Sequence, residues 1–239
     1  MLDALTEVVR NGYYALGAPL FKAAIRRASA RCKSLDDHLT VTERVRFRGF
    51  TIRAYQVREE ILGFLRHVAL LEPQRVVEIG TARGGTFYLL CKVAGPKAHL
   101  VSVDLPGGGF GSGYAAWKIP LFHSFAREQQ RITLLRCDSH DPSTVELMRS
   151  AFDGALVDVM LIDGDHEYEG VKRDFEMYRG LVRSGGVIAF HDIVPGSTRT
   201  VGGVPRFWQE VKAGWPGKSR EFVGDWNQGG YGIGVITVP

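Results

Sequence analysis

The feature that most constrains the fold is the alternation, from Val76 onward, of short β-branched runs with longer segments of helical period. This alternation is typical of a parallel sheet with helices on both faces, so we predict an α/β protein with a doubly wound, mostly parallel sheet. The predicted strands are nearly continuous apolar runs, as expected when both faces of a strand are covered. The strands are Val76–Ile79, Leu100–Asp104, Ile132–Arg136, Val157–Asp163 and Gly186–His191, and the helices between them are Thr86–Ala94, Leu121–Gln130, Pro142–Phe152 and Tyr168–Val182.

The first 70 residues have a different pattern, which predicts a helical appendage over residues 1–70 ahead of a ligand-binding domain over residues 71–239. Helices are predicted at Leu2–Ala28 and Tyr55–Leu70, on either side of an uncertain stretch at Val45–Ile52. The apolar residues of the first helix recur at helical spacing, which favours packing on the domain or on a second subunit. We therefore expect a homo-oligomer.

Two further segments stand outside this alternation. Pro106–Gly113 contains five glycines in eight residues directly after the second strand, and we interpret it as a lid over a ligand. Tyr114 and Trp117, which follow it, are candidates for the wall of a substrate pocket, with simple core packing as the alternative, and His123 is a lesser candidate for reaching the site. The carboxyl-terminal residues 231–238 and 221–223 are expected to form a hairpin.

Composition excludes several classes of protein. With 239 residues, 45% hydrophobic and 23% charged, the chain is typical of a soluble globular protein. No apolar run approaches the roughly 18 residues that span a bilayer, and the first residues are acidic where a signal peptide is basic, so we expect a cytoplasmic protein without stable membrane insertion. Residues 1–60 hold 11 of the 30 Lys and Arg and 7 of the 26 Asp and Glu, which leaves 19 against 19. Without a concentrated basic face in the second part, we expect no nucleic-acid partner.

Polar residues follow the predicted strands where ligands bind in such sheets, at the carboxyl ends. The first strand runs into a glycine-rich turn, Glu78–Thr86, which lets a ligand approach the backbone and the next helix. As a dinucleotide fingerprint this turn lacks the middle glycine, because Ala82 stands there. Asp104 ends the second strand 24 residues after Gly80, where a carboxylate can accept hydrogen bonds from both ribose hydroxyls, a feature that several cofactor classes share.

The third, fourth and fifth strands also end in polar residues. Asp138 and Ser139 follow the third strand, either to bind a ligand or to cap the next helix. Asp163 ends the fourth strand, and His191 and Asp192 end the fifth. Neighbouring strands would place these three side chains around one crevice, as a plausible ligand set for a divalent ion. The alternative is that His191 and Asp192 form a hydrogen-bonded pair that supports a substrate pocket.

The turn Glu78–Gly84 has the pattern ExGxxxG and resembles the first motif of class I S-adenosylmethionine-dependent methyltransferases. That resemblance, which covers roughly Val76–Val194, implies a Rossmann-like methyltransferase sheet. It also implies a cofactor site made by Glu78, Gly80, Thr81, Gly84, Gly85, Thr86, Asp104, Asp138, Ser139 and Asp163.

An aspartate after the fourth strand and an acidic pair after the fifth resemble the metal-dependent O-methyltransferases of the catechol and macrolide-sugar types, with cephalosporin-hydroxylase-like proteins in the same group. In the sugar enzymes a histidine acting as general base follows the aspartate by three residues, and His166 stands at that distance from Asp163. The resemblance therefore implies Asp163 and His166 as catalytic residues and Asp163, His191 and Asp192 as metal ligands. His191 is a departure from the family pattern, and imidazole suits manganese, iron or zinc better than magnesium.

The resulting expectation is an S-adenosylmethionine-dependent O-methyltransferase that acts on a hydroxyl of a small molecule, a sugar or a natural product, assisted by a divalent ion such as Mg²⁺ or Mn²⁺. Methyltransferases that act on nitrogen commonly carry an (Asn/Asp)-Pro-Pro-(Tyr/Phe) segment after the fourth strand, and this chain has Asp163-Gly-Asp-His166 there. The alternatives are an NAD(P)-dependent oxidoreductase, an iron- and oxoacid-dependent hydroxylase, and a non-catalytic cofactor-binding subunit.

Overall fold

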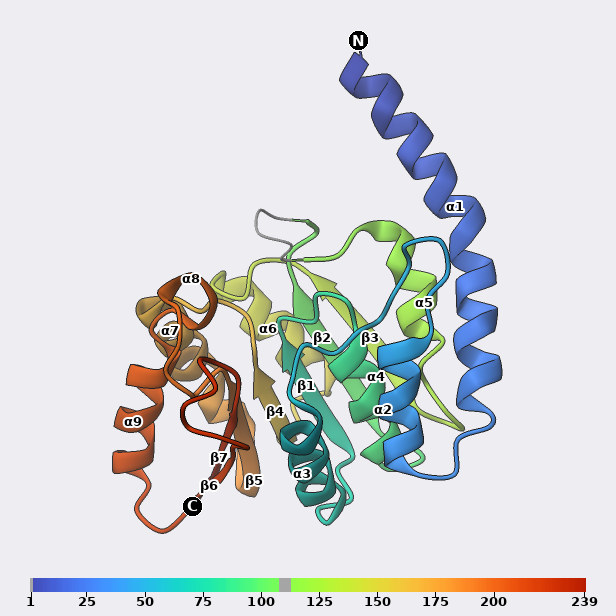
Figure 1. Ribbon diagram of the computed structural model, residues 1–239. Coiled ribbons are helices and arrows are strands. Elements are labelled where there is room, and N and C mark those ends of the chain that lie inside the picture. Colours follow the sequence, from blue (N-terminus) through green and yellow to red (C-terminus); the bar gives the residue numbers. More distant parts are fainter. Residues whose placement is uncertain (1, 108–112) are drawn as a thin grey trace.

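The computed structural model describes residues 2–107 and 113–239, and its centre is one seven-stranded sheet of order β3-β2-β1-β4-β5-β7-β6 (Figure 1). The first five strands of that order are parallel, β7 is antiparallel to β5, and β6 is antiparallel to β7. This confirms the predicted doubly wound sheet and the terminal hairpin. The strands are β1 Arg75–Ile79, β2 His99–Asp104, β3 Arg131–Arg136, β4 Val157–Ile162, β5 Val182–His191, β6 Ser219–Phe222 and β7 Ile233–Thr237.

Helices cover both faces of the sheet, and each face has its own apolar layer (Figure 1). The layer on one face joins the strands to the helices α1 to α5, and the layer on the other face joins them to α6, α7 and α9. The helices are α1 Leu2–Ser29, α2 Leu35–Arg44, α3 Arg58–Ala69, α4 Gly85–Val93, α5 Ile119–His123, α6 Pro142–Ala151, α7 Tyr168–Tyr178, α8 Thr198–Val201 and α9 Val204–Gly214, with short 3-10 helices at Ala116–Lys118 and Arg179–Leu181.

The predicted helix Leu121–Gln130 is wrong beyond its first turn, since α5 ends at His123. The chain turns at Glu128, whose φ of 52° is left-handed and incompatible with a continuing helix. The side chain of Gln130 then donates to the carbonyl oxygens of Cys91 and Ala94 at the end of α4, at 2.9 and 3.3 Å. These contacts hold residues 124–130 as a loop, although their apolar spacing is helical.

The boundary between α7 and β5 also differs from the prediction. The helix predicted to reach Val182 ends at Tyr178, and β5 begins at Val182 instead of Gly186. Gly185 lies inside the strand with a φ of 72°. The pairing of β4 with β5 shifts register between Val157 and Val159, so the glycine accommodates an irregularity in the strand.

The amino-terminal segment contains one helix that the pattern did not predict. α2 begins with a capping box, in which the Ser34 hydroxyl and the Asp37 carboxylate each accept a backbone N–H. Arg58, at the start of α3, makes ion pairs with Asp36 and Glu43 at 2.7 and 2.6 Å and so joins the two helices. Residues 45–52, the uncertain stretch, form a small bridged turn between Phe47 and Phe50. Apolar residues of α2 and α3 belong to the same layer as the sheet residues.

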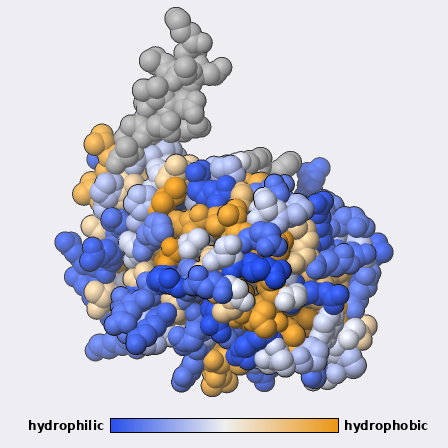
Figure 2. All heavy atoms as spheres, turned by 180° about the vertical axis from the view of Figure 1, so that it is seen from behind, coloured by the Kyte–Doolittle hydropathy of each residue, from blue (hydrophilic) through white to orange (hydrophobic). Residues whose placement is uncertain are grey.

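The first half of α1 extends beyond the body of the molecule, while its second half packs beside α5 (Figure 1). Phe21 and Ile25 are buried there, whereas Leu16 and Leu20 on the same helix are 79% and 59% exposed. Seen from behind, the surface is mainly hydrophilic, with apolar atoms gathered near α1 and in the middle of this face (Figure 2). No helix in the described part of the chain is long and apolar enough to span a membrane.

Candidate functional site

The glycine-rich turn between β1 and α4 is held tightly against its neighbours. A Cβ on Gly80, whose φ is 90°, would lie 2.0 Å from the carbonyl oxygen of Asp163, and one on Gly85 would lie 2.1 Å from that of Ile52. Ala82 occupies the position that lacks the expected glycine and has a left-handed φ of 45°. The backbone therefore follows a glycine-like path at that position despite the side chain, and Nζ of Lys118 donates to the Ala82 carbonyl at 2.8 Å.

Asp104, at the end of β2, fixes this turn. Its Oδ2 accepts the N–H of Ala82 at 2.6 Å, and its Oδ1 accepts the N–H of Leu105 at 2.8 Å. Burial raises the pKa of Asp104, against the lowering effect of these backbone donors. The backbone N–H groups of Gly113 and Thr81 also act on this carboxylate, so hydroxyl donors of a ligand would share its acceptor positions with the backbone.

Glu78 lies at the floor of the turn with 1% of its surface exposed. Burial raises its pKa well above the ordinary value, although a hydrogen bond from Thr81 acts in the opposite direction. Its Oε2 is buried and has no hydrogen-bond partner among the residues that the structure describes. A buried unpartnered oxygen is costly, which makes this atom available to a donor group of a ligand or to a proton.

A narrow hollow adjoins the turn. It is lined by Gly80–Thr86, by Asp163 and by Arg53–Gln56, an amino-terminal segment that the sequence did not connect with the site. Gln56 joins the parts, because its Nε2 donates to Oδ2 of Asp163 at 3.2 Å and its Oε1 accepts from the hydroxyl of Thr86 at 2.9 Å. A second, mainly apolar hollow lies between α1 and α5, lined by Ala18, Pro19, Lys22, Trp117, Pro120 and Leu121, and it has no acidic group or histidine.

Asp138 and Ser139, after β3, do not line the hollow beside the turn. Asp138 is exposed and accepts the N–H of His140 at 2.8 Å. The alternative that these residues cap the next helix is wrong, because Asp141 is the residue that caps α6 by accepting from Ser143.

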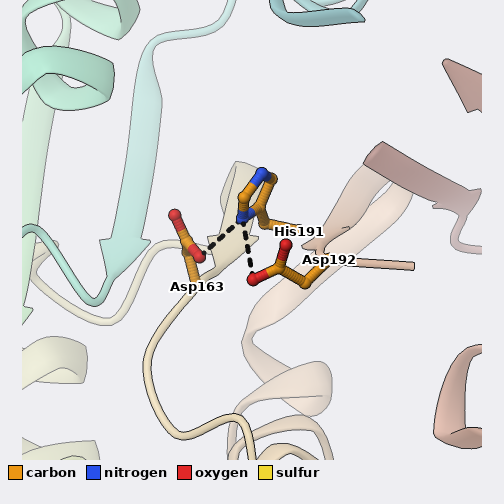
Figure 3. Close-up of side chains that lie close together, drawn as sticks. All are labelled: Asp163, His191 and Asp192. Atoms are coloured by element: carbon orange, nitrogen blue, oxygen red, sulfur yellow. Dashed lines mark hydrogen bonds and ion pairs between the residues drawn. The ribbon is translucent and has the colours of Figure 1, made fainter. Parts of the chain in front are cut away.

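Asp163, His191 and Asp192 meet at the carboxyl ends of β4 and β5, as the order of the strands predicts (Figure 3). The Nδ1 atom of His191 lies 3.1 Å from Oδ1 of Asp163 and 3.4 Å from Oδ2 of Asp192. One ligand atom from each residue lies within 4.8 Å of the other two. His191 is 5% exposed, and its Nε2 is buried without a partner. Asp192 has a left-handed φ of 62°, which turns its carboxylate back toward the cluster.

His166 approaches the same cluster from the loop after β4. Its Nδ1 bonds the carbonyl oxygen of Thr200, and its Nε2 lies 3.7 Å from Oδ1 of Asp163. Because a carbonyl only accepts, that bond places a proton on Nδ1. Asp165, the neighbour of His166 in the sequence, accepts the N–H of Glu167 at 2.9 Å. The carbonyl of Thr200 therefore orients His166.

The charges of the cluster are strongly coupled. Burial opposes ionisation of Asp163, but the charge of His191 and contacts with both histidines hold the pKa of Asp163 well below its ordinary value. The contact with Asp163 raises the pKa of His166 to about 9. Burial lowers the pKa of His191, but the two neighbouring aspartates raise it. The result is a pKa well above the ordinary value of histidine. The carboxylates thus attract positive charge to this point, which is also what a cation site requires.

The segment predicted to form a lid is described only in part, and the candidate side chains that follow it do not face the cluster. Most of the segment 106–113 lies outside the described residues, so the lid stays a prediction. Tyr114 is buried and approaches Phe122 at 4.8 Å between ring centroids, and Trp117 stacks on Tyr14 of α1 at 4.8 Å. Both pack in the apolar layer rather than facing the cluster. His123 is exposed and makes no contact with the cluster among the described side chains.

Part of the chain matches a known family model, and part of it is similar to a curated protein. Residues 77–193 match a family model described as a methyltransferase domain. An uncharacterized protein of Acanthamoeba polyphaga mimivirus is 26% identical over 150 residues, which are 59% of this chain and 61% of the relative. The chain thus spans less than two thirds of the length of that curated relative.

Solved structures share the fold at low sequence identity. An O-methyltransferase of Bacillus cereus, in complex with S-adenosylhomocysteine, is 16% identical with a TM-score of 0.53, and the match covers 92% of this chain and 99% of that one. An O-methyltransferase of Streptomyces achromogenes involved in tomaymycin synthesis, in complex with S-adenosylmethionine, is 18% identical with a TM-score of 0.53 and coverages of 91% and 96%.

Proposed function

Because the chain carries a methyltransferase domain on the class I S-adenosylmethionine-dependent fold, we propose that it transfers a methyl group to a hydroxyl of a small molecule. The observation that carries the proposal is the convergence of His166 on the cluster of Asp163, His191 and Asp192, directly beside the hollow at the glycine-rich turn. A base, two acids and the glycine-rich turn thus meet at one edge of the sheet.

The proposed S-adenosylmethionine site is the glycine-rich turn together with Asp104. The left-handed path through Ala82 keeps the turn against Asp104, whose carboxylate is proposed to accept the ribose hydroxyls. The unpartnered Oε2 of Glu78 fits a ligand that supplies a donor there. Asp138 is proposed for the adenine end, since it is exposed at the end of the neighbouring strand. When bound, the sulfonium cofactor supplies an activated methyl group.

The proposed role of His166 is to remove the proton of the acceptor hydroxyl. The carbonyl of Thr200 holds the proton on Nδ1, so that Nε2 accepts the proton once the ring is neutral. Because Asp163 raises the pKa of His166 to about 9, the neutral ring is populated mainly at alkaline pH unless a cation at Asp163 weakens this effect. Asp163 lies 3.7 Å from Nε2 and stabilises the imidazolium that results. The aspartate thus has an electrostatic role beside its role as a ligand.

A divalent cation is proposed between Asp163, His191 and Asp192. The residues fit such an ion, because two carboxylate oxygens and one imidazole nitrogen converge at the strand ends among otherwise buried groups. This mixed set is better suited to Mn²⁺, Fe²⁺ or Zn²⁺ than to Mg²⁺. When bound, the ion would lower the pKa of a hydroxyl that coordinates it.

A hydroxyl acceptor is favoured over an amine for two reasons. The loop after β4 has Asp163, Asp165 and His166 where many nitrogen methyltransferases have a Pro-Pro segment. Two solved structures that share the fold are O-methyltransferases, one of them involved in tomaymycin synthesis. An NAD(P)-dependent oxidoreductase is not favoured by these comparisons.

The test is a methyl-transfer assay with radiolabelled S-adenosylmethionine on phenolic, sugar and amine acceptors, with Mn²⁺, Zn²⁺ or EDTA. We expect label on a hydroxyl compound, and we expect His166→Gln to lower kcat at least 100-fold with unchanged affinity for S-adenosylhomocysteine. His123→Gln is the matched control, since it is an exposed histidine away from the cluster. Transfer to amines alone, or full activity of His166→Gln, would contradict the proposal.

A further inference from the structure

The loop between β6 and β7 brings one aromatic side chain to the cluster. The chain there reads Gly229-Gly230-Tyr231-Gly232, so Tyr231 is the single residue of the run with a side chain. Its ring centroid lies 6.3 Å from that of His191, with 59° between the planes, and the residue is 42% exposed. An exposed aromatic ring beside buried titratable groups is available for contact with a ligand.

Hydrogen bonds fix the backbone of Tyr231 and of the residue after it. Its N–H donates to Oδ1 of Asp192 at 3.0 Å, and its carbonyl accepts from Val194 at 2.9 Å. The next N–H, of Gly232, donates to Oε2 of the buried Glu60 at 2.9 Å. The position of the ring therefore depends on the same aspartate that faces the cluster, rather than on packing of the ring itself.

Tyr231 has a left-handed φ of 64°, which disfavours a bulky residue. Glycine is the residue that such a conformation favours, and glycines precede and follow this position. A tyrosine here costs stability that its exposed ring does not recover by burial. Residues in such sparsely populated conformations cluster at ligand sites, where the surrounding structure holds them in place.

We propose that Tyr231 forms one wall of the acceptor site and selects acceptors that present the face of a ring. The inference rests on the proposed function for the identity of the site, and it adds a specificity-determining residue. The ring of Tyr231 lies 6.3 Å from that of His191, whose Nδ1 contacts Asp163 and Asp192, so the exposed ring borders the point where the two carboxylates meet. Both a phenolic ring and a sugar ring offer this chemistry.

The test compares three probes that share adjacent hydroxyls: catechol, methyl β-D-glucopyranoside and 2,3-butanediol, which has no ring. Binding is measured by ligand-observed NMR in the presence of S-adenosylhomocysteine, with and without Zn²⁺. We expect at least one ring probe to bind about 10-fold more tightly than butanediol. The catechol and glucoside arms distinguish a phenolic from a sugar acceptor.

Tyr231→Gly is the decisive variant, because glycine relieves the left-handed backbone and so preserves the fold. We expect it to abolish the preference for ring probes, with an unchanged Tm or a higher one and an unchanged affinity for S-adenosylhomocysteine, while Tyr231→Phe retains the preference. Tyr13→Ala, which removes a ring of similar exposure on α1, is the control. A wild-type protein without a ring preference, or a Tyr231→Gly variant that keeps it, overturns the inference. Ring binding without methyl transfer would overturn the proposed function alone.

Discussion

The Nδ1 atom of His191 lies 3.1 Å from Oδ1 of Asp163, so that the last residue of β5 and the residue after β4 share one hydrogen bond. The two strands are neighbours in the sheet, and their register pairs Ile162 with Phe190, each one residue before this contact. The relationship therefore follows from strand pairing itself. It places an imidazole where related methyltransferases, by the resemblance of the sequence, carry an acid.

Replacement of His191 tests the ligand set. His191→Asp would give three carboxylates, which favour Mg²⁺ over Zn²⁺, because hard oxygen donors suit magnesium. We expect the ratio of Mg²⁺ to Zn²⁺ affinity to rise about 10-fold or more relative to the wild type, as measured by calorimetric metal titration. His99→Gln, a change at a buried histidine at the opposite end of the sheet, is the control. An unchanged ratio would mean that His191 does not face a cation.

Gly80 tests how closely the turn approaches Asp163. A Cβ there would lie 2.0 Å from the Asp163 carbonyl oxygen, in a backbone that is already left-handed, so Gly80→Ala is expected to destabilise by about 3 kcal/mol or more. Gly154→Ala is the matched control, since Gly154 has a φ of 78° and no atom within 4 Å, and it should cost only about 1–2 kcal/mol. Urea denaturation measures both values. Equal costs would show that the contact carries no strain.

Glu60 tests the anchoring of the loop that bears Tyr231. Its carboxylate is 2% exposed and accepts from the N–H groups of Gly224 and Gly232 and from the side chain of Gln228. Glu60→Leu leaves these donors without that acceptor, so we expect a loss of about 2–4 kcal/mol and faster amide exchange at Gly232. The same change at the exposed Glu59 on the same helix should have little effect. Protection of Gly232 that survives in Glu60→Leu would contradict the assignment.

The partly buried ring of His38 predicts how the stability of the fold depends on pH. Burial, followed by the charge of Lys92, lowers the pKa of His38 to about 4, so the folded state favours the neutral ring. The unfolded chain then binds more protons between pH 6.5 and 4, and the corresponding stability is present above that window and lost as the pH falls through it. We expect a loss of about 1–2 kcal/mol, reduced because the ring is only half-buried. In His38→Gln this part of the slope should vanish in denaturation curves recorded from pH 7 to pH 4. An identical slope would show that other groups cause it.

The sheet could be predicted because its strands are apolar on both faces, as Val76, Val77 and Leu100 illustrate, and so have a signal independent of the rest of the chain. The α2 helix begins at a local signal in the sequence, the capping box of Ser34 and Asp37, although its apolar pattern did not predict it. The apolar residues of the segment after His123 have helical spacing, but hydrogen bonds from Gln130 to the end of α4 determine its conformation.

The candidate site could be predicted only in part, for a similar reason. Asp163, His191 and Asp192 are brought together by adjacent parallel strands, which the order of elements implies. Gln56 is 107 positions from its partner Asp163, and Glu60 is 172 positions from Gly232. Contacts of this range depend on how the amino-terminal segment crosses the sheet, and no periodicity in the sequence encodes them.

The most direct test of the account is calorimetric titration of the purified protein with S-adenosylmethionine, S-adenosylhomocysteine and NAD, on the wild type and on Asp104→Asn and His166→Gln. The account predicts micromolar binding of both adenosyl ligands and none of NAD. It also predicts at least 10-fold weaker binding in Asp104→Asn and unchanged binding in His166→Gln, because only Asp104 faces the ribose in the proposed site. A response to NAD alone, or equal losses in the two variants, would contradict it.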